Sequence, residues 1–148
     1  MSDLSAIQKL REKTGVSVIA VKRALDKADG DMAKAEEFLK EEAGDIASKK
    51  SDRETKAGII QSYIHAGKIG VLVKIKCETD FVAKNEDFQT FARAIAMQIA
   101  ASEASSVEEL LKETNFRNPS ETVSDMVKEA ISKYGENIEI AEFKKIEL

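Results

Sequence analysis

Hydrophobic and polar residues alternate along positions 69–77, and this is the most regular pattern in the chain. The apolar positions are Ile69, Val71, Val73, Ile75 and Cys77. A period of two places these side chains on one face of a β-strand. Upstream, Ile60, Ser62 and Ile64 alternate with Ile59, Gln61, Tyr63 and His65, and the short segment 66–68 between the two runs contains a glycine. The pattern therefore predicts two strands joined as an antiparallel hairpin.

The hydrophobic spacing becomes helical after this hairpin. The apolar positions are then Phe88, Phe91, Ala92, Ile95 and Ile99. Asn85 can cap the N-terminus of this helix, and the two acidic residues that follow suit the positive end of the helix dipole. We expect a helix from residue 85 or 86 to about Ser102. The connector Glu78–Lys84 should belong to neither element.

Two further helices are expected beyond residue 102. A serine- and glutamate-rich stretch holds at most a short helix, around Val107–Lys112. For the next helix, Asn118 can act as N-cap, Pro119 suits the first position and Glu121 stands where a capping-box partner belongs. Gly135 should end this helix.

Residues 138–148 return to alternation and predict a final strand. The alternation slips near Phe143, as at a β-bulge. The order strand, strand, helix, helix, strand predicts an α+β fold, in which a small antiparallel sheet has helices packed on one face.

The first 44 residues predict three short helices. Gly15, Gly30 and Gly44 are expected to end them, and Ser17 and Asp31 can cap the second and third. The inward-facing positions are Leu4, Ile7, Leu10, Val18, Val21, Ala24, Leu25, Ala28, Met32, Ala35, Phe38 and Leu39. Three short helices with short loops should pack as a small bundle with a thin core.

Residues 45–56 are nearly all polar and carry both signs of charge. They can form either a flexible linker or a solvated helix. We take this segment as the boundary between a three-helix bundle, residues 1–44, and an α+β core domain, residues 57–148.

Composition narrows the possible functions. The 148 residues include 43% hydrophobic residues, enough for a core, and the net charge of −4 argues against nonspecific nucleic-acid binding. Most of the acidic excess lies in residues 103–148. A single cysteine excludes an internal disulfide and fits a reducing compartment. No hydrophobic run approaches membrane-spanning length, so the expected location is the cytoplasm and no membrane partner is expected.

Residues able to support covalent chemistry are few. The chain has one histidine, His65, and one cysteine, Cys77, on strands that should be neighbours. A Cys–His pair is conceivable, but Cys77 continues the apolar face of its strand, so a buried inert thiol is the stronger interpretation. Neither residue has neighbours at metal-ligand spacing, and no glycine-rich phosphate loop occurs. We expect no cofactor, no metal and no enzymatic activity.

Phe81 lies in the connector between the strand and the helix, beside the carboxylate of Asp80. The ring can tuck into the core between sheet and helix, or it can protrude from a short rigid connector toward a pocket of another protein. In the second case Asp80 would orient the loop or meet a donor of the partner. Spacing alone leaves both alternatives open.

Four segments of the chain resemble elongation factor Ts, the bacterial nucleotide exchange factor for elongation factor Tu. They are LREKTGVSVIAVKRAL, GDMAKAEEFL, CETDFVAKNEDFQTFA and AISKYGENIEI, in this order. Thr79-Asp80-Phe81-Val82 is the most specific piece. The three-helix start is less specific, because ubiquitin-associated bundles share it.

The resemblance implies a factor that binds elongation factor Tu·GDP and promotes GDP release during translation, with no covalent catalysis of its own. It implies that Asp80 and Phe81, within the motif that also contains Thr79 and Val82, contact the nucleotide-binding domain of the partner near its magnesium site. The phenylalanine ring would wedge between helices there.

The resemblance also implies that the N-terminal bundle docks on the partner. Val18, Ile19 and Lys22 match the partner-facing patch of the family. Ile19 and Lys22 fall off the inward-facing stripe of their helix, so from the residues alone this face is either a plain solvated surface or a docking edge.

The chain departs from the common family pattern in one respect. Common members carry a second core half and a projecting helical hairpin, where this chain has only residues 102–122. Short members with one core half act as dimers, so we expect a homodimer with the acidic last third at or near the interface. The alternative function is a pure interaction module, a ubiquitin-associated-like bundle fused to an adaptor domain without any effect on nucleotide.

Overall fold

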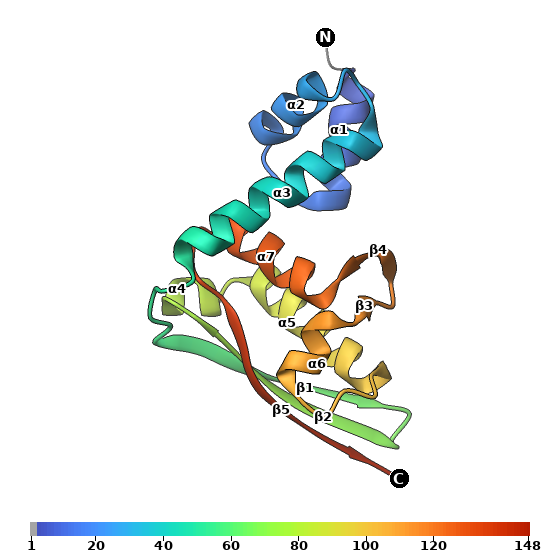
Figure 1. Ribbon diagram of the computed structural model, residues 1–148. Coiled ribbons are helices and arrows are strands. Elements are labelled where there is room, and N and C mark those ends of the chain that lie inside the picture. The colour runs from blue at the N-terminus through green and yellow to red at the C-terminus, as the bar shows by residue number, and fades with distance from the viewer. Residues whose placement is uncertain (1–2) are drawn as a thin grey trace.

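The structure is a computed structural model that describes residues 3–148. It confirms the α+β prediction, with helices at the N-terminus and a mixed helix and sheet body below them (Figure 1). The helices are α1 (Leu4–Thr14), α2 (Val18–Lys27), α3 (Met32–Lys50), α4 (Asp80–Ala83), α5 (Glu86–Ala101), α6 (Val107–Lys112) and α7 (Val123–Tyr134). The strands are β1 (Ala57–His65), β2 (Ile69–Cys77), β3 (Thr114–Asn115), β4 (Asn118–Thr122) and β5 (Glu139–Glu147).

The main sheet is antiparallel with the order β1-β2-β5, and it confirms the predicted hairpin. The central strand β2 pairs with β1 along its whole length and with β5 on its other side. In the second pair, Lys74 lies opposite Glu142 and Ile75 lies opposite Ile140, so Ala141 is an extra residue. This bulge accounts for the slip in alternation near Phe143.

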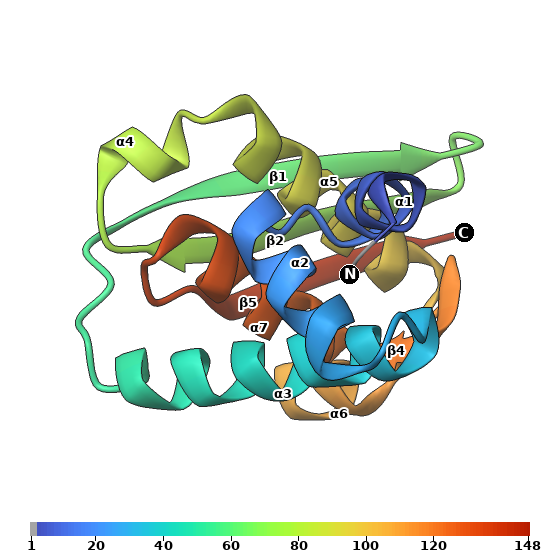
Figure 2. The same cartoon turned by 90° about the horizontal axis from the view of Figure 1, so that it is seen from above.

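One face of the sheet is covered by helices and the other face is open (Figure 1). Seen from above, α4 and α5 lie toward the β1 edge, whereas α7 and α3 lie toward the β5 side (Figure 2). The alternate residues of β2 point into the core beneath them, where Phe88 of α5 is fully buried. Its ring meets Tyr134 of α7 edge-on, with 5.8 Å between ring centroids.

Helix α3 joins the bundle to the core. The expectation that it ends at Gly44 was wrong, because the helix continues to Lys50. Ala35 and Leu39 of its first half are buried in the bundle, and Ala47 of its second half is buried in the core of the α+β body. Packing of this second half outweighs the poor helix propensity of one glycine, which costs only about 1 kcal/mol.

The remainder of the expected linker is held against the core. Asn137 donates from its side-chain amide to the carbonyl oxygens of Ser51, at 3.4 Å, and Arg53, at 2.8 Å. The Thr55 hydroxyl donates to the carboxylate of Glu139. Residues 45–56 therefore consist of a helical first part and an extended second part that is tied down at three points.

The start of α7 differs from the prediction. Thr122, not Asn118, is the N-cap, and its capping-box partner is Asp125. Residues 118–122 instead form β4, which pairs with β3 in a small hairpin that the sequence pattern did not predict. The predicted end at Gly135 is confirmed, since this residue has the left-handed conformation typical of a C-cap.

Candidate partner-binding surface

The connector between β2 and α5 contains one turn of helix, α4, and presents Phe81 to solvent. The ring is 85% exposed, so the alternative in which it tucks into the core is excluded. Asp80 beside it is also exposed. A large aromatic side chain held outward on a short ordered segment is unusual on a free surface and is typical of binding sites.

The inner side of α4 anchors this turn. Val82 and Ala83 are buried in the same hydrophobic cluster as Phe88. Val82, which the family resemblance placed in the partner-binding motif, therefore faces the protein's own core rather than the surface. Because its neighbours are fixed in the core, Phe81 is presented from a rigid base.

Thr79 also belongs to the support of the turn. Its hydroxyl accepts a hydrogen bond from the backbone N–H of Val82 at 3.3 Å, as expected of an N-cap. The same hydroxyl donates to Glu136 at 2.7 Å. Sequence reasoning did not identify Glu136, whose only signal was its place in the segment AISKYGENIEI after the helix-ending Gly135.

The second candidate surface lies on the bundle. Val18 is partly exposed, Ile19 is 77% exposed and Lys22 is exposed, all on α2. A shallow groove between α1 and α2 is lined in part by Leu4, Val18 and Lys22. Leu4 was expected to face inward, but it is exposed at the edge of this groove because the helix begins there.

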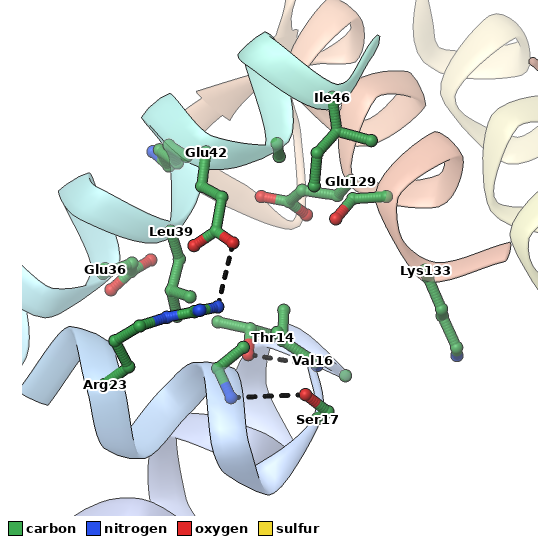
Figure 3. Close-up of a pocket in the computed structure, with 15 residues that line it drawn as sticks. Thr14, Val16, Ser17, Arg23, Glu36, Leu39, Glu42, Ile46, Glu129 and Lys133 are labelled. Atoms are coloured by element: carbon green, nitrogen blue, oxygen red, sulfur yellow. Dashed lines mark hydrogen bonds and ion pairs between the residues drawn. The ribbon is translucent and has the colours of Figure 1, made fainter. Parts of the chain in front are cut away.

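A cavity of about 290 Å³ lies between the bundle and α7 (Figure 3). In the close-up, Arg23 of α2 reaches toward Glu42 of α3, with 3.1 Å between the guanidinium and the carboxylate, and Glu129 of α7 lies on the opposite wall. Burial and the nearby carboxylate of Glu121 raise the pKa of Glu129 to about 8. The cavity lining combines these charged groups with small and aliphatic side chains, and it marks a junction between the two hydrophobic clusters.

His65 and Cys77 do not form a pair. His65 lies opposite Ile69 at the hairpin end, whereas Cys77 lies opposite Ala57 at the other end of the two strands. Eight residues of strand separate the two positions, a distance of roughly 26 Å. Cys77 is buried, and burial raises the pKa of its thiol, as expected of an inert side chain. A reactive Cys–His pair formed by these two residues is therefore excluded.

No cluster of three or more histidine, cysteine, aspartate or glutamate side chains suitable for a metal occurs among the described residues. Across the same residues, every helix is too short or too polar to cross a bilayer.

Comparisons with known proteins agree with the fold and the motif. Residues 78–148 match the sequence profile of the family described as Elongation factor TS. The chain is 38% identical to elongation factor Ts of Carboxydothermus hydrogenoformans, over 96% of this chain and 87% of that protein. It is 35% identical to elongation factor Ts of Desulfosudis oleivorans, over 97% of this chain and 96% of that protein. It is 43% identical to elongation factor Ts of Clostridium kluyveri, but spans only 46% of that longer protein.

These similarities define the chain as a translation elongation factor. It belongs to the elongation factor Ts family. The alignment with the Carboxydothermus protein extends over 188 positions, more than the 148 residues of this chain, so that relative carries segments that this chain lacks.

Proposed function

We propose that this chain is a guanine nucleotide exchange factor, which binds elongation factor Tu·GDP and promotes GDP release without covalent catalysis of its own. The observation that carries the proposal is the exposed ring of Phe81 on the anchored turn α4. Membership of the elongation factor Ts family indicates elongation factor Tu as the partner, and the protruding ring of Phe81 is a side chain that can insert into it. Such a factor acts in the cytoplasm, where the single thiol of Cys77 stays reduced.

Burial of this ring in the partner would contribute binding free energy to exchange. Burying a phenylalanine side chain in a partner contributes roughly 1.5–3 kcal/mol from area alone. Little of this energy is lost in ordering the segment, because Val82 and Thr79 already hold the turn in the free protein. Asp80, exposed beside the ring, is placed to accept a hydrogen bond from the partner.

Exchange requires that the ring binds better when the nucleotide is held poorly. A factor that bound both states of its partner equally would release nothing. The coupling is reciprocal, so GDP must weaken binding of the factor as much as the factor weakens binding of GDP. Phe81 therefore acts by wedging into a site that opens only when the nucleotide pocket is distorted.

The bundle provides a separate docking surface in this proposal. We assign Val18, Ile19 and Lys22 to contact with elongation factor Tu, and residues 1–44 to a docking domain distinct from the core at 57–148. The two hydrophobic clusters, one in each part, support this division. The anchored segment 51–56 would then set the distance between the docking patch and Phe81.

We further propose that the chain acts as a homodimer through the open face of its main sheet. Exposed apolar side chains lie near one end of this face, namely Ile60, Ile64, Leu72 and Ile146. Ile146 belongs to the acidic last third of the chain, in agreement with the expected place of the interface. Light scattering tests this proposal, and a monomer that still exchanges nucleotide would contradict it.

Release of a fluorescent GDP analogue from elongation factor Tu tests the main proposal. The wild-type chain should accelerate release, and Phe81→Ala should slow the accelerated rate by tenfold or more, the factor expected from roughly 1.5–3 kcal/mol. Phe116→Ala is a matched control, because Phe116 is also exposed but lies on the β3–β4 hairpin. Unchanged release with Phe81→Ala would remove Phe81 from the mechanism.

The same assay distinguishes a nucleotide exchange factor from a pure interaction module. A pure interaction module would bind elongation factor Tu and leave the rate of GDP release unchanged. Acceleration by the wild-type chain excludes that alternative.

A further inference from the structure

We propose that Glu136 is a positioning residue for nucleotide exchange, because its carboxylate holds the turn from which Phe81 projects. This inference rests on the proposed function. Glu136 is half-buried and follows α7, more than fifty residues away from the turn in sequence. Gly135 adopts the left-handed conformation, with φ of 70°, and so turns the chain back at the end of α7.

Three donors converge on the Glu136 carboxylate. One oxygen, Oε1, accepts from the backbone N–H groups of Glu78 at 3.1 Å and Thr79 at 3.0 Å. The other, Oε2, accepts from the hydroxyl of Thr79 at 2.7 Å. Hydrogen bonds to a charged acceptor are stronger than neutral ones, and a set of three fixes both position and direction.

The contact with Thr79 also controls the first turn of α4. A threonine hydroxyl has one proton and two acceptor lone pairs. Because the proton is directed to Glu136, a lone pair is left for the N–H of Val82, which donates to this oxygen at 3.3 Å. A chain of hydrogen bonds thus runs from Glu136 through Thr79 to Val82, next to Phe81 in sequence.

The segment that precedes α4 also holds the segment that follows α7. The side chain of Glu78 accepts from the backbone N–H of Asn137 and forms an ion pair with Arg53 at 3.6 Å. Residues 78–79 and residues 136–137 therefore hold each other, and the same junction binds the segment that leads to the bundle. The turn that carries Phe81 and the segment that leads to the bundle are therefore both fixed to this junction.

The protein should remain folded without the Glu136 carboxylate. The turn retains the buried side chains of Val82 and Ala83 when the carboxylate is removed, and Glu136 itself belongs to neither hydrophobic cluster. Loss of this carboxylate should therefore allow the Phe81 side chain to vary in orientation while the protein stays folded. The variant loses the stabilisation of these hydrogen bonds but keeps both hydrophobic clusters, so it should remain folded at the temperature of the assay.

Kinetics of GDP release with single and double variants test the inference. Glu136→Ala should slow the accelerated release about tenfold, the factor that corresponds to loss of a hydrogen bond to a charged group. Glu136→Gln should recover part of the rate, because its amide oxygen can still accept the two backbone N–H bonds while its NH₂ group cannot accept from Thr79. Glu139→Ala is the matched control, since Glu139 is nearby and accepts a hydrogen bond from Thr55 instead of from the turn.

The double variant Phe81→Ala with Glu136→Ala identifies the route of the effect. If Glu136 acts through Phe81, the double variant should be no slower than Phe81→Ala alone. Amide hydrogen exchange at Val82, Ala83 and Lys84 should be faster in Glu136→Ala than in the wild-type chain, with β1 and β2 unchanged.

The outcomes separate this inference from the proposed function. Slow release with Phe81→Ala but normal release with Glu136→Ala overturns the role of Glu136 and leaves the proposed function intact. Additive slowing in the double variant also overturns it, because Glu136 would then act by another route. Unchanged release with Phe81→Ala defeats the proposed function, and with it any role of Glu136 in exchange. Unchanged amide exchange in Glu136→Ala would show that Glu136 does not hold the turn.

Discussion

The carboxylates of Glu121, in β4, and Glu129, in α7, lie close enough to interact, and Glu129 lines the cavity between the bundle and the core. The negative charge of one carboxylate disfavours ionisation of the other, so Glu129 retains its proton to a higher pH. Burial is the largest cause of the raised pKa of Glu129, and the charges of Glu121 and Asp125 add to it. Lys40 opposes the effect, and its ammonium group also donates to the carbonyl oxygen of Ser120.

This pair predicts that stability falls as the pH rises from about 4.5 to about 8. In the native protein Glu129 holds its proton to about pH 8, whereas its ordinary pKa is 4.5. The native state therefore binds more protons than the unfolded state in this window, and the stabilisation is lost as the pH rises through the upper value. Glu129→Gln should be more stable than the wild-type chain at pH 8 by about 1–2 kcal/mol, a value reduced for solvent screening.

Urea unfolding of the wild-type chain and Glu129→Gln at pH 5 and pH 8 measures this difference. Glu37→Gln, on the exposed side of α3, is the control and should leave the pH dependence as it is. A gap between Glu129→Gln and the wild-type chain that does not widen with pH would contradict the prediction.

Local signals predicted most of the fold. The period-two alternation in β2 places every second side chain on one face, and the structure confirms the predicted β1–β2 hairpin. Ser17, Asp31 and Asn85 are N-caps as expected, because a side-chain oxygen beside a helical hydrophobic pattern is a local property of the chain. These features needed no knowledge of the tertiary contacts.

The errors arose where tertiary packing decides between local alternatives. Gly44 resembled a helix end, but burial of Ala47 against the core carries α3 beyond it. For α7 the sequence pattern placed the N-cap at Asn118, but the helix is capped at Thr122. The later start agrees with the full burial of Val123, the first helical residue.

Tertiary packing also limits how much of the candidate site the sequence can predict. The motif around Phe81 stands out in the sequence, but the direction of the ring depends on contacts that spacing does not show. Val82 and Phe81 are neighbours in the motif, and the structure places the first in the core and the second in solvent. The hydrogen bonds of Glu136 join segments that are distant in sequence, and no local pattern predicts them.

The two capping patterns of α7 can be distinguished by substitution. Thr122→Ala removes the hydroxyl that accepts from the N–H of Asp125 at 3.1 Å, so it should destabilise the protein by about 1 kcal/mol. Asn118→Ala removes hydrogen bonds from Ser120 at the start of β4 and should change stability by less than about 0.5 kcal/mol. Thermal or urea unfolding compares them, and an equal or larger effect of Asn118→Ala would show that the helix is capped at the other site.

Gly58 is the glycine whose replacement should be most harmful. It lies opposite Lys76 in the β1–β2 pair, with φ of 157°. A methyl group at this position would overlap the carbonyl oxygen of Ile75 and lie 2.9 Å from the Cα of Lys76. These are backbone atoms of the central strand, so they cannot move aside without disturbing the core. Gly58→Ala should cost about 2–3 kcal/mol, in the range of overpacked sites.

Gly44→Ala is the matched control for this prediction. Gly44 lies within α3, and a methyl group there would meet no atom within 4 Å beyond its chain neighbours and the adjacent backbone of its own helix. The substitution should stabilise the protein by about 0.5–1 kcal/mol, because alanine favours the helix more than glycine does. Urea unfolding of both variants measures the opposite signs. Equal effects of the two alanines would mean that close contact between β1 and β2 does not constrain position 58.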